Sequence, residues 1–120
     1  MHAKHICAVM VHVPNLKQGL NWYEKAFSNA TRQRLEGQDF EYLQVGEVRI
    51  EIVKADEKVT SGPAGTVVYW EVENLTQVLA HLQALGAKVY RGPMSIEHKR
   101  SMCQLQDPWG NCIGLRGPTQ

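Results

Sequence analysis

VPNLKQGL at residues 13–20 returns as VENLTQVL at residues 72–79, 59 positions later in a chain of 120. Five of the eight positions are identical, and the offset is about half the chain length. Each copy ends an apolar run and starts a helical pattern, so both mark the same junction between a strand and a helix. The repeat indicates a duplicated building block and identifies positions in the two halves that should be equivalent.

The first half reads as a strand, a helix and three further strands. Residues 5–13 are rich in β-branched side chains and form the first predicted strand. Asn15 supplies a side-chain oxygen that can cap the helix, which runs to about Phe27. Turns at residues 36–38 and at Gly46 separate the strands that follow. These three strands are predicted at about residues 31–36, 39–45 and 47–53.

The second half repeats this order. Residues 66–72 form its first strand, Asn74 caps its helix, and Gly86 ends that helix. Three more strands are predicted at about residues 88–91, 98–106 and 111–116. Each half therefore has the order βαβββ. A ferredoxin-like βαββαβ unit is the competing fold, but it has too few strands after each helix.

We therefore predict one α+β domain over residues 1–120, made of two tandem modules. Module one covers residues 5–53, module two covers residues 66–116, and a polar hinge at residues 54–65 joins them. A single βαβββ unit has one helix covering one face of its sheet, so its other face needs a partner. The modules should form a cupped mixed sheet with the helices on the outside.

The charge and composition of the chain exclude some classes of binding partner. Thirteen basic and twelve acidic residues give a net charge of +1, and the longest basic run is Lys99-Arg100, so a nucleic-acid partner is not expected. Three cysteines in strand-like apolar stretches are typical of small buried side chains in a reducing compartment. The apolar run at residues 6–11 is too short to span a membrane. We expect a cytoplasmic protein with no membrane partner.

Several short sequences in both modules resemble those of a known family. The Asn-Leu helix starts, the triplet at residues 50–52 and the sequence DPWGNCIGL at residues 107–115 are similar to the vicinal oxygen chelate superfamily. This group includes glyoxalase I, bleomycin-resistance proteins, extradiol dioxygenases and fosfomycin-resistance enzymes. The resemblance covers about residues 5–116. It implies that two modules make one large cleft, and that a chain of this length forms a homodimer.

The resemblance also implies where a metal would be held. Family enzymes take ligands, mostly His, Glu or Gln, from the first and last strand of each module. The equivalent positions here are Ala8, Glu51, Val67 and Gly114. Three of these four residues have no side-chain donor, and a single carboxylate is too few ligands for a catalytic metal. The resemblance therefore predicts neither a metal nor another cofactor in this chain.

A different register would bring other residues to these positions. His5 and His12 flank Ala8, but a shift of three residues turns His5 to the other face of the strand. His12 keeps the correct face but lies at the far end of the strand beside Pro14. Thr66 could replace Val67 if the strand bulges, and one hydroxyl would not restore the site.

Alternation along the predicted strands assigns side chains to the cleft. The candidate ligand-binding residues are Met10, His12, Tyr42, Arg49, Tyr69, Arg100, Met102 and Gln104, and the candidate catalytic residue is Glu51. Apolar walls with a few polar groups are typical of pockets for small organic molecules.

Three functions fit these residues. The first is a binding protein that holds a small organic molecule in a metal-free cleft. The second is a glyoxalase-like lyase or isomerase in which Glu51 is the general base and Arg49 or Arg100 stabilises an anionic substrate. The third is a regulatory or structural module whose cleft is only a dimer seam. Glu51 favours the second function, and the missing metal ligands favour the first.

Overall fold

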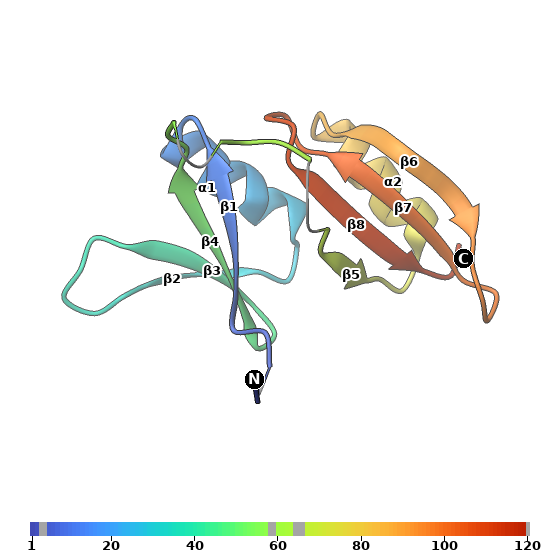
Figure 1. The fold of residues 1–120 in the computed structure, drawn as a ribbon, viewed down its shortest axis with the longest axis horizontal. Coiled ribbons are helices and arrows are strands. Elements are labelled where there is room, and N and C mark those ends of the chain that lie inside the picture. Colours follow the sequence, from blue (N-terminus) through green and yellow to red (C-terminus); the bar gives the residue numbers. More distant parts are fainter. Residues whose placement is uncertain (3–4, 58–59, 64–66, 120) are drawn as a thin grey trace. The chain divides into compact units, whose positions relative to one another are not determined.

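The computed structural model describes residues 1–2, 5–57, 60–63 and 67–119. The chain divides into two compact units, Met1–Thr60 and Ser61–Gln120 (Figure 1). Each unit contains a strand, a helix and three further strands, so the predicted tandem βαβββ modules are confirmed. The predicted hinge and the strand at residues 66–72 include positions 58–59 and 64–66, which lie outside the described residues.

Unit 1 is a four-stranded mixed sheet with one helix. Its elements are β1 (Ala8–Val13), α1 (Leu16–Ala26), β2 (Thr31–Arg34), β3 (Glu41–Val45) and β4 (Val48–Lys54). The strand order is β1-β4-β3-β2, with β1 parallel to β4 and the other pairs antiparallel. The parallel pair is possible because α1 carries the chain from β1 across one face of the sheet to the opposite edge.

Local chemistry explains where α1 begins and which face it buries. The Asn15 side chain accepts a hydrogen bond from the Gln18 backbone N–H at 3.0 Å, as the sequence predicted. Gly19 then lets the helix approach the sheet closely. A Cβ atom built on Gly19 would lie 2.6 Å from Val13 Cγ2 and 3.0 Å from Ile52 Cγ2. The core of unit 1 therefore lies between α1 and the side chains of β1 and β4.

Unit 2 has the same order of elements in a second sheet. Its elements are β5 (Tyr69–Glu71), α2 (Leu75–Ala84), β6 (Lys88–Ser95), β7 (Ser101–Gln106) and β8 (Cys112–Gly117). The strand order is β5-β8-β7-β6, and β5 is parallel to β8. The Asn74 side chain caps α2 by accepting from the Gln77 N–H at 3.1 Å. The two units thus share topology and caps.

The turn before β8 is held by one buried carboxylate. Asp107 is 4% exposed, and its Oδ1 accepts hydrogen bonds at 2.9 Å from the backbone N–H groups of Trp109 and Asn111. The Asn111 side-chain oxygen in turn accepts from the Gly62 N–H at 2.9 Å. The DPWGN sequence therefore holds both its own turn and Gly62, near the start of unit 2.

Several predicted strand boundaries in unit 2 were wrong, and one of them is the start of β5, which begins at Tyr69 instead of residue 66. β6 continues to Ser95 instead of ending near residue 91, because the strand absorbs Gly92 and Pro93 as an irregularity in its pairing with β7. β7 begins at Ser101 instead of residue 98. His98 and Lys99 have φ angles of 61° and 59°, which belong to a turn and cannot continue a strand.

One cysteine also differs from the prediction. Cys103 is buried and Cys112 is half-buried, but Cys7, which lies one residue before β1, is exposed. Burial raises the pKa of the Cys103 and Cys112 thiols. None of the described helices is long and apolar enough to cross a membrane.

Candidate functional site

Each sheet has one face packed on its helix and one face turned away from it. Leu43, Ile50 and Ile52 of unit 1 are at most 1% exposed and belong to the helix side. In unit 2 the helix-side residues include Leu105 and Leu115, which are 0% and 2% exposed. Because side chains alternate along a strand, their neighbours occupy the opposite face. We call these opposite surfaces the helix-free faces.

Five predicted site residues share the helix-free face of unit 1. Met10 lies opposite Glu51 across the parallel β1–β4 pair, and His12 lies opposite Val53 one row further along. Arg49 is two residues before Glu51 on β4, and Tyr42 of β3 reaches the same row. These residues come from three adjacent strands. The sequence analysis assigned them to one surface only because side chains alternate along a strand.

Arg49 organises this face. Its guanidinium carbon lies 3.9 Å from the centre of the Tyr42 ring, within the range of a cation–π contact. Its Nε lies 3.7 Å from Oε2 of Glu51. The Glu51 side chain is 17% exposed and Met10 is 54% exposed. The face therefore presents a carboxylate, a guanidinium, a phenol and a thioether within a few residues of one another.

The other four predicted residues lie in unit 2. Gln104 of β7 lies opposite Gly114 of β8, and Gly114 lies opposite Tyr69 of β5, so these three residues form one row. Gln104 Nε2 donates a hydrogen bond to the Tyr69 hydroxyl at 2.5 Å. Met102 lies in the next row, opposite Arg116. Arg100 precedes β7 and forms an ion pair with Glu71.

Arg116 is a residue of this face that the sequence analysis missed. Its guanidinium carbon lies 4.2 Å from the centre of the Tyr69 ring. Two positions separate Arg116 from Gly114 on the same strand, so alternation would have found it. Each unit therefore has an arginine stacked on a tyrosine on its helix-free face, although the two pairs come from different strands.

Gly114 lies against the Tyr69 ring. A Cβ atom built on Gly114 would lie 2.7 Å from Cδ1 of Tyr69 and 2.8 Å from the Val68 carbonyl oxygen. Real Cβ contacts are essentially never this short. The ring, fixed by Gln104 and Arg116, thus fills the space that a side chain at position 114 would need.

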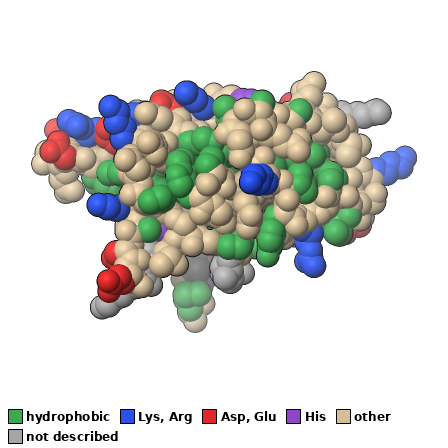
Figure 2. Space-filling model, turned by 90° about the horizontal axis from the view of Figure 1, so that it is seen from above, with side chains coloured by type: hydrophobic (Ala, Val, Ile, Leu, Met, Phe, Trp, Pro, Cys, Tyr) green, Lys and Arg blue, Asp and Glu red, His purple; other side chains and the backbone are tan. Residues whose placement is uncertain are grey.

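Charge is dispersed over the face shown in Figure 2. On the face shown in Figure 2, lysine and arginine side chains lie apart and alternate with acidic or uncharged atoms, so that face carries no continuous basic area. Within the part of the chain that the structure describes, no group of three His, Cys, Asp or Glu side chains is arranged to hold a metal ion.

The sequence profile of the Glyoxalase/Bleomycin resistance protein/Dioxygenase superfamily matches residues 4–115. The chain belongs to this superfamily. Solved structures of similar fold include an integron cassette protein from Vibrio cholerae, at 18% identity and a TM-score of 0.75 over 98% of this chain and 97% of that one. No curated protein matches the sequence.

Two further structures carry family names. A glyoxalase/bleomycin resistance protein/dioxygenase family enzyme from Burkholderia phytofirmans is 15% identical, with a TM-score of 0.75 over 92% of this chain and 95% of that one. The fosfomycin resistance protein FosX from Mesorhizobium loti is 13% identical, with a TM-score of 0.71 over 99% and 95% of the two chains. At these identities the likeness concerns the fold.

The four metal-ligand positions implied for this superfamily do not suit a divalent ion here. Ala8 and Val67 have no side-chain donor atom, and the Glu51 carboxylate forms an ion pair with Arg49. Gly114 also lacks a donor, and the Tyr69 ring occupies the space where one would start. A zinc or similar ion needs at least three protein ligands, which these residues do not supply.

Proposed function

We propose that this superfamily member binds a small organic molecule on its helix-free faces without the help of a metal ion. The observation that carries the proposal is the packing of Tyr69 on Gly114. A metal-binding relative needs a donor side chain at this position, whereas here the phenol ring fills that space and is held by Gln104 and Arg116. The surface is therefore organised around an aromatic ring and a guanidinium.

The residues on these faces suit an organic ligand. Met10 and Met102 supply apolar and adaptable contacts, and the rings of Tyr42 and Tyr69 supply flat surfaces. The guanidinium groups stacked on these rings keep N–H donors for a carbonyl or carboxylate of the ligand. An apolar surface with a few orienting donors is the usual composition of a small-molecule site.

A ligand screen by saturation-transfer NMR, with a set of aromatic compounds, tests the proposal. For any compound that binds, Tyr69→Ala and Arg116→Ala should each weaken binding about tenfold or more, because each removes a contact of a partly desolvated site. Gln83→Ala, an exposed position on α2, is the matched control and should leave affinity unchanged. Binding that is indifferent to Tyr69 and Arg116 would overturn the proposal.

Glu51 supports a second candidate, a glyoxalase-like lyase or isomerase. Its carboxylate is only 17% exposed and lies on the helix-free face, where a general base would be placed. Glu51→Gln separates the two functions, since it removes the base and keeps the shape. If the parent protein turns over a substrate and Glu51→Gln binds it equally well but no longer turns it over, the protein is an enzyme. If the parent protein shows no turnover and Glu51→Gln binds the ligand as the parent does, it is a binding protein.

We also propose that the chain works as a homodimer in the cytoplasm. Several large apolar side chains, among them Ile6, Met10, Tyr90 and Met94, are 46–66% exposed and are available for contact with a second copy. Light scattering coupled to size-exclusion chromatography should give twice the chain mass of 13.5 kDa. A monomer at micromolar concentration would contradict this.

A further inference from the structure

The pairing of β3 with β4 in unit 1 stops before either strand ends. Its last pair is Leu43 opposite Ile50, although β3 begins at Glu41 and β4 continues to Lys54. In this register Glu41 would lie opposite Ile52, but these two residues are not paired. Over the same stretch β3 stays paired with β2, and β4 stays paired with β1. The sheet therefore splits between β3 and β4 at this end.

The backbone groups of both strands face this split. The N–H groups of Arg49 and Ala55 donate to carbonyl oxygens on the β1 side, at 3.1 Å and 2.8 Å. Because backbone groups alternate in direction along a strand, the N–H and C=O of Ile52 point the other way, toward β3. On β3, the Phe40 carbonyl accepts a hydrogen bond on the β2 side at 2.9 Å. The backbone groups of Glu41 therefore point toward β4.

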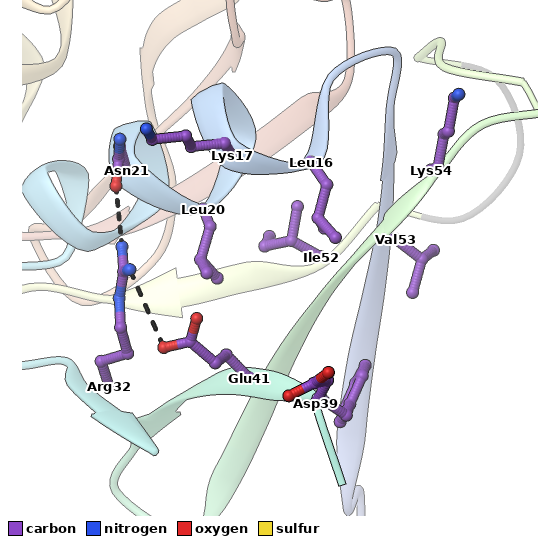
Figure 3. Close-up of a pocket in the computed structure, with 11 residues that line it drawn as sticks. Leu16, Lys17, Leu20, Asn21, Arg32, Asp39, Glu41, Ile52, Val53 and Lys54 are labelled. Atoms are coloured by element: carbon purple, nitrogen blue, oxygen red, sulfur yellow. Dashed lines mark hydrogen bonds and ion pairs between the residues drawn. The ribbon is translucent and has the colours of Figure 1, made fainter. Parts of the chain in front are cut away.

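Glu41 gives a physical reason for the split. By alternation its side chain is on the same face of β3 as Leu43, which is 0% exposed beneath α1. A carboxylate opposite Ile52 would be buried in this apolar layer, which is costly. The Glu41 side chain instead is 36% exposed and lies 3.9 Å from the Arg32 guanidinium, as the dashed line in Figure 3 shows.

A cavity of about 540 Å³ opens where the two strands separate, beside the first half of α1. This volume is within the range of small-molecule sites. Leu16, Leu20 and Ile52 point toward the same space (Figure 3). Ile52 is 1% exposed and Leu16 is 48% exposed, so the cavity leads from the core to the surface. Glu51 lies on the opposite face of β4, so this cavity is separate from the helix-free face.

The charged side chains around the cavity favour neither sign of ligand charge. The carboxylates of Glu41 and Asp39 each lie near an arginine, at 3.9 Å and 3.5 Å. The amines of Lys17 and Lys54 point away from the apolar lining (Figure 3). An ion would have to leave water for apolar side chains without gaining a close partner. The cavity therefore suits an uncharged molecule.

We propose that the split between β3 and β4 binds an uncharged molecule with a secondary amide on an apolar chain. The amide takes the place of the missing backbone pairing, because its N–H can donate to one strand while its carbonyl accepts from the other. The apolar chain lies against Leu16, Leu20 and Ile52. This site goes beyond the proposed function of the helix-free faces and does not depend on it.

N-Hexylacetamide is a suitable probe, and two-dimensional amide NMR of the full chain reports where it binds. It should shift the amide signals of Leu16, Leu20 and Ile52 at millimolar concentration. Hexyl acetate, which replaces the amide N–H by oxygen, should bind about threefold to tenfold more weakly, the effect of one hydrogen bond. Hexanoate and hexylammonium should also bind more weakly. An ester that binds as tightly as the amide, or an ion that binds more tightly, would overturn the proposal.

Hydrogen exchange tests whether the backbone at the split is open. In the unliganded protein the Ile52 amide should exchange faster than that of Ile50, which lies in the paired part of the sheet. N-Hexylacetamide should slow the exchange of Ile52. The proposal is wrong if Ile52 exchanges as slowly as Ile50 without the probe, or if the probe shifts Tyr69 and Gln104 instead.

Glu41→Val tests the split from the other direction. The introduced side chain can pack opposite Ile52, so the pairing should extend and close the cavity. The affinity for N-hexylacetamide should then fall about tenfold or more, and Ile52 exchange should slow without the probe. Glu47→Gln, at an exposed position in the turn between β3 and β4, is the control and should change neither. Unchanged binding in a Glu41→Val protein whose Ile52 has become protected would contradict the proposal.

Discussion

Single positions in this chain are constrained by close approach of backbone and side chain. Gly19 illustrates this, because helix propensity and packing predict opposite effects on stability when it is replaced by alanine. In an exposed helix, alanine is more stable than glycine by about 1 kcal/mol. Here the added methyl group would meet Val13 and Ile52, which are 0% and 1% exposed and cannot move aside easily.

We therefore predict that Gly19→Ala lowers the free energy of unfolding by about 1–3 kcal/mol, as overpacking of a core does. Urea denaturation followed by circular dichroism measures this. Gln18→Ala, at the adjacent exposed position of α1, is the control and should change stability by less than about 0.5 kcal/mol. If the Gly19→Ala protein is more stable than the parent, the gain in helix propensity outweighs the cost of overpacking, and the prediction is wrong.

Gly114 is constrained by Tyr69 in the same way. Gly114→Ala should lower the free energy of unfolding by about 1–3 kcal/mol, because the new methyl group meets the ring and the Val68 carbonyl. The cost should be smaller in a Tyr69→Ala background, where the ring is gone and only the Val68 carbonyl still obstructs the methyl group. Equal costs in both backgrounds, measured by denaturation, would mean that the ring does not fill this space.

The thiols should differ in reactivity. Burial raises the pKa of Cys103 and Cys112, so a smaller fraction of each is thiolate at pH 8, and thiolate is the reactive form. Cys7 is exposed. Ellman's reagent should therefore modify one thiol rapidly in the folded protein and all three in denaturant. Three equally fast reactions without denaturant would contradict the described burial.

At the scale of elements, the repeated Asn-Leu sequence starts both helices. The side-chain oxygens of Asn15 and Asn74 each accept a hydrogen bond from the backbone N–H three residues further along, at 3.0 Å and 3.1 Å. The sequence could predict this because a cap is a local feature that depends on four neighbouring residues. The alternation of strands β1, β4, β7 and β8 was predictable for a similar reason, since each has a buried face.

Asn15→Ala and Asn74→Ala should each lower the free energy of unfolding by about 0.5–2 kcal/mol, because each leaves a helix N–H without its partner. Asn15→Asp and Asn74→Asp, which can still accept this hydrogen bond, are the controls and should retain most of the stability. Thermal unfolding monitored by circular dichroism distinguishes them. If the alanine variants are as stable as the parent, the caps are not needed.

Other elements could not be read from the sequence. Gly92-Pro93 is normally a signal for a turn, but β6 accommodates it through pairing with β7, which is a contact between distant residues. The turn at His98 and Lys99 has no glycine to announce its positive φ angles. A cavity of about 540 Å³ between α1, β3 and β4 of unit 1 depends on the spacing between these elements, which no periodicity encodes.

For the whole molecule, duplication explains why so much could be predicted. A repeat at half the chain length identified the module order, and the superfamily profile over residues 4–115 agrees with it. Alternation along the strands predicted which residues lie on the helix-free faces. It did not predict that the Tyr69 ring packs over Gly114. Sequence shows that position 114 has no donor, and only the structure shows that the space is filled.

The central claim is that this scaffold recognises its ligand without a divalent ion. Isothermal titration of chelator-treated protein with Zn²⁺, Mn²⁺, Ni²⁺ and Fe²⁺, repeated with Glu51→Gln, tests it most directly. We predict no stoichiometric binding of any of these ions and no difference between the two proteins. One equivalent of a metal bound tightly per chain, and lost in Glu51→Gln, would contradict the account.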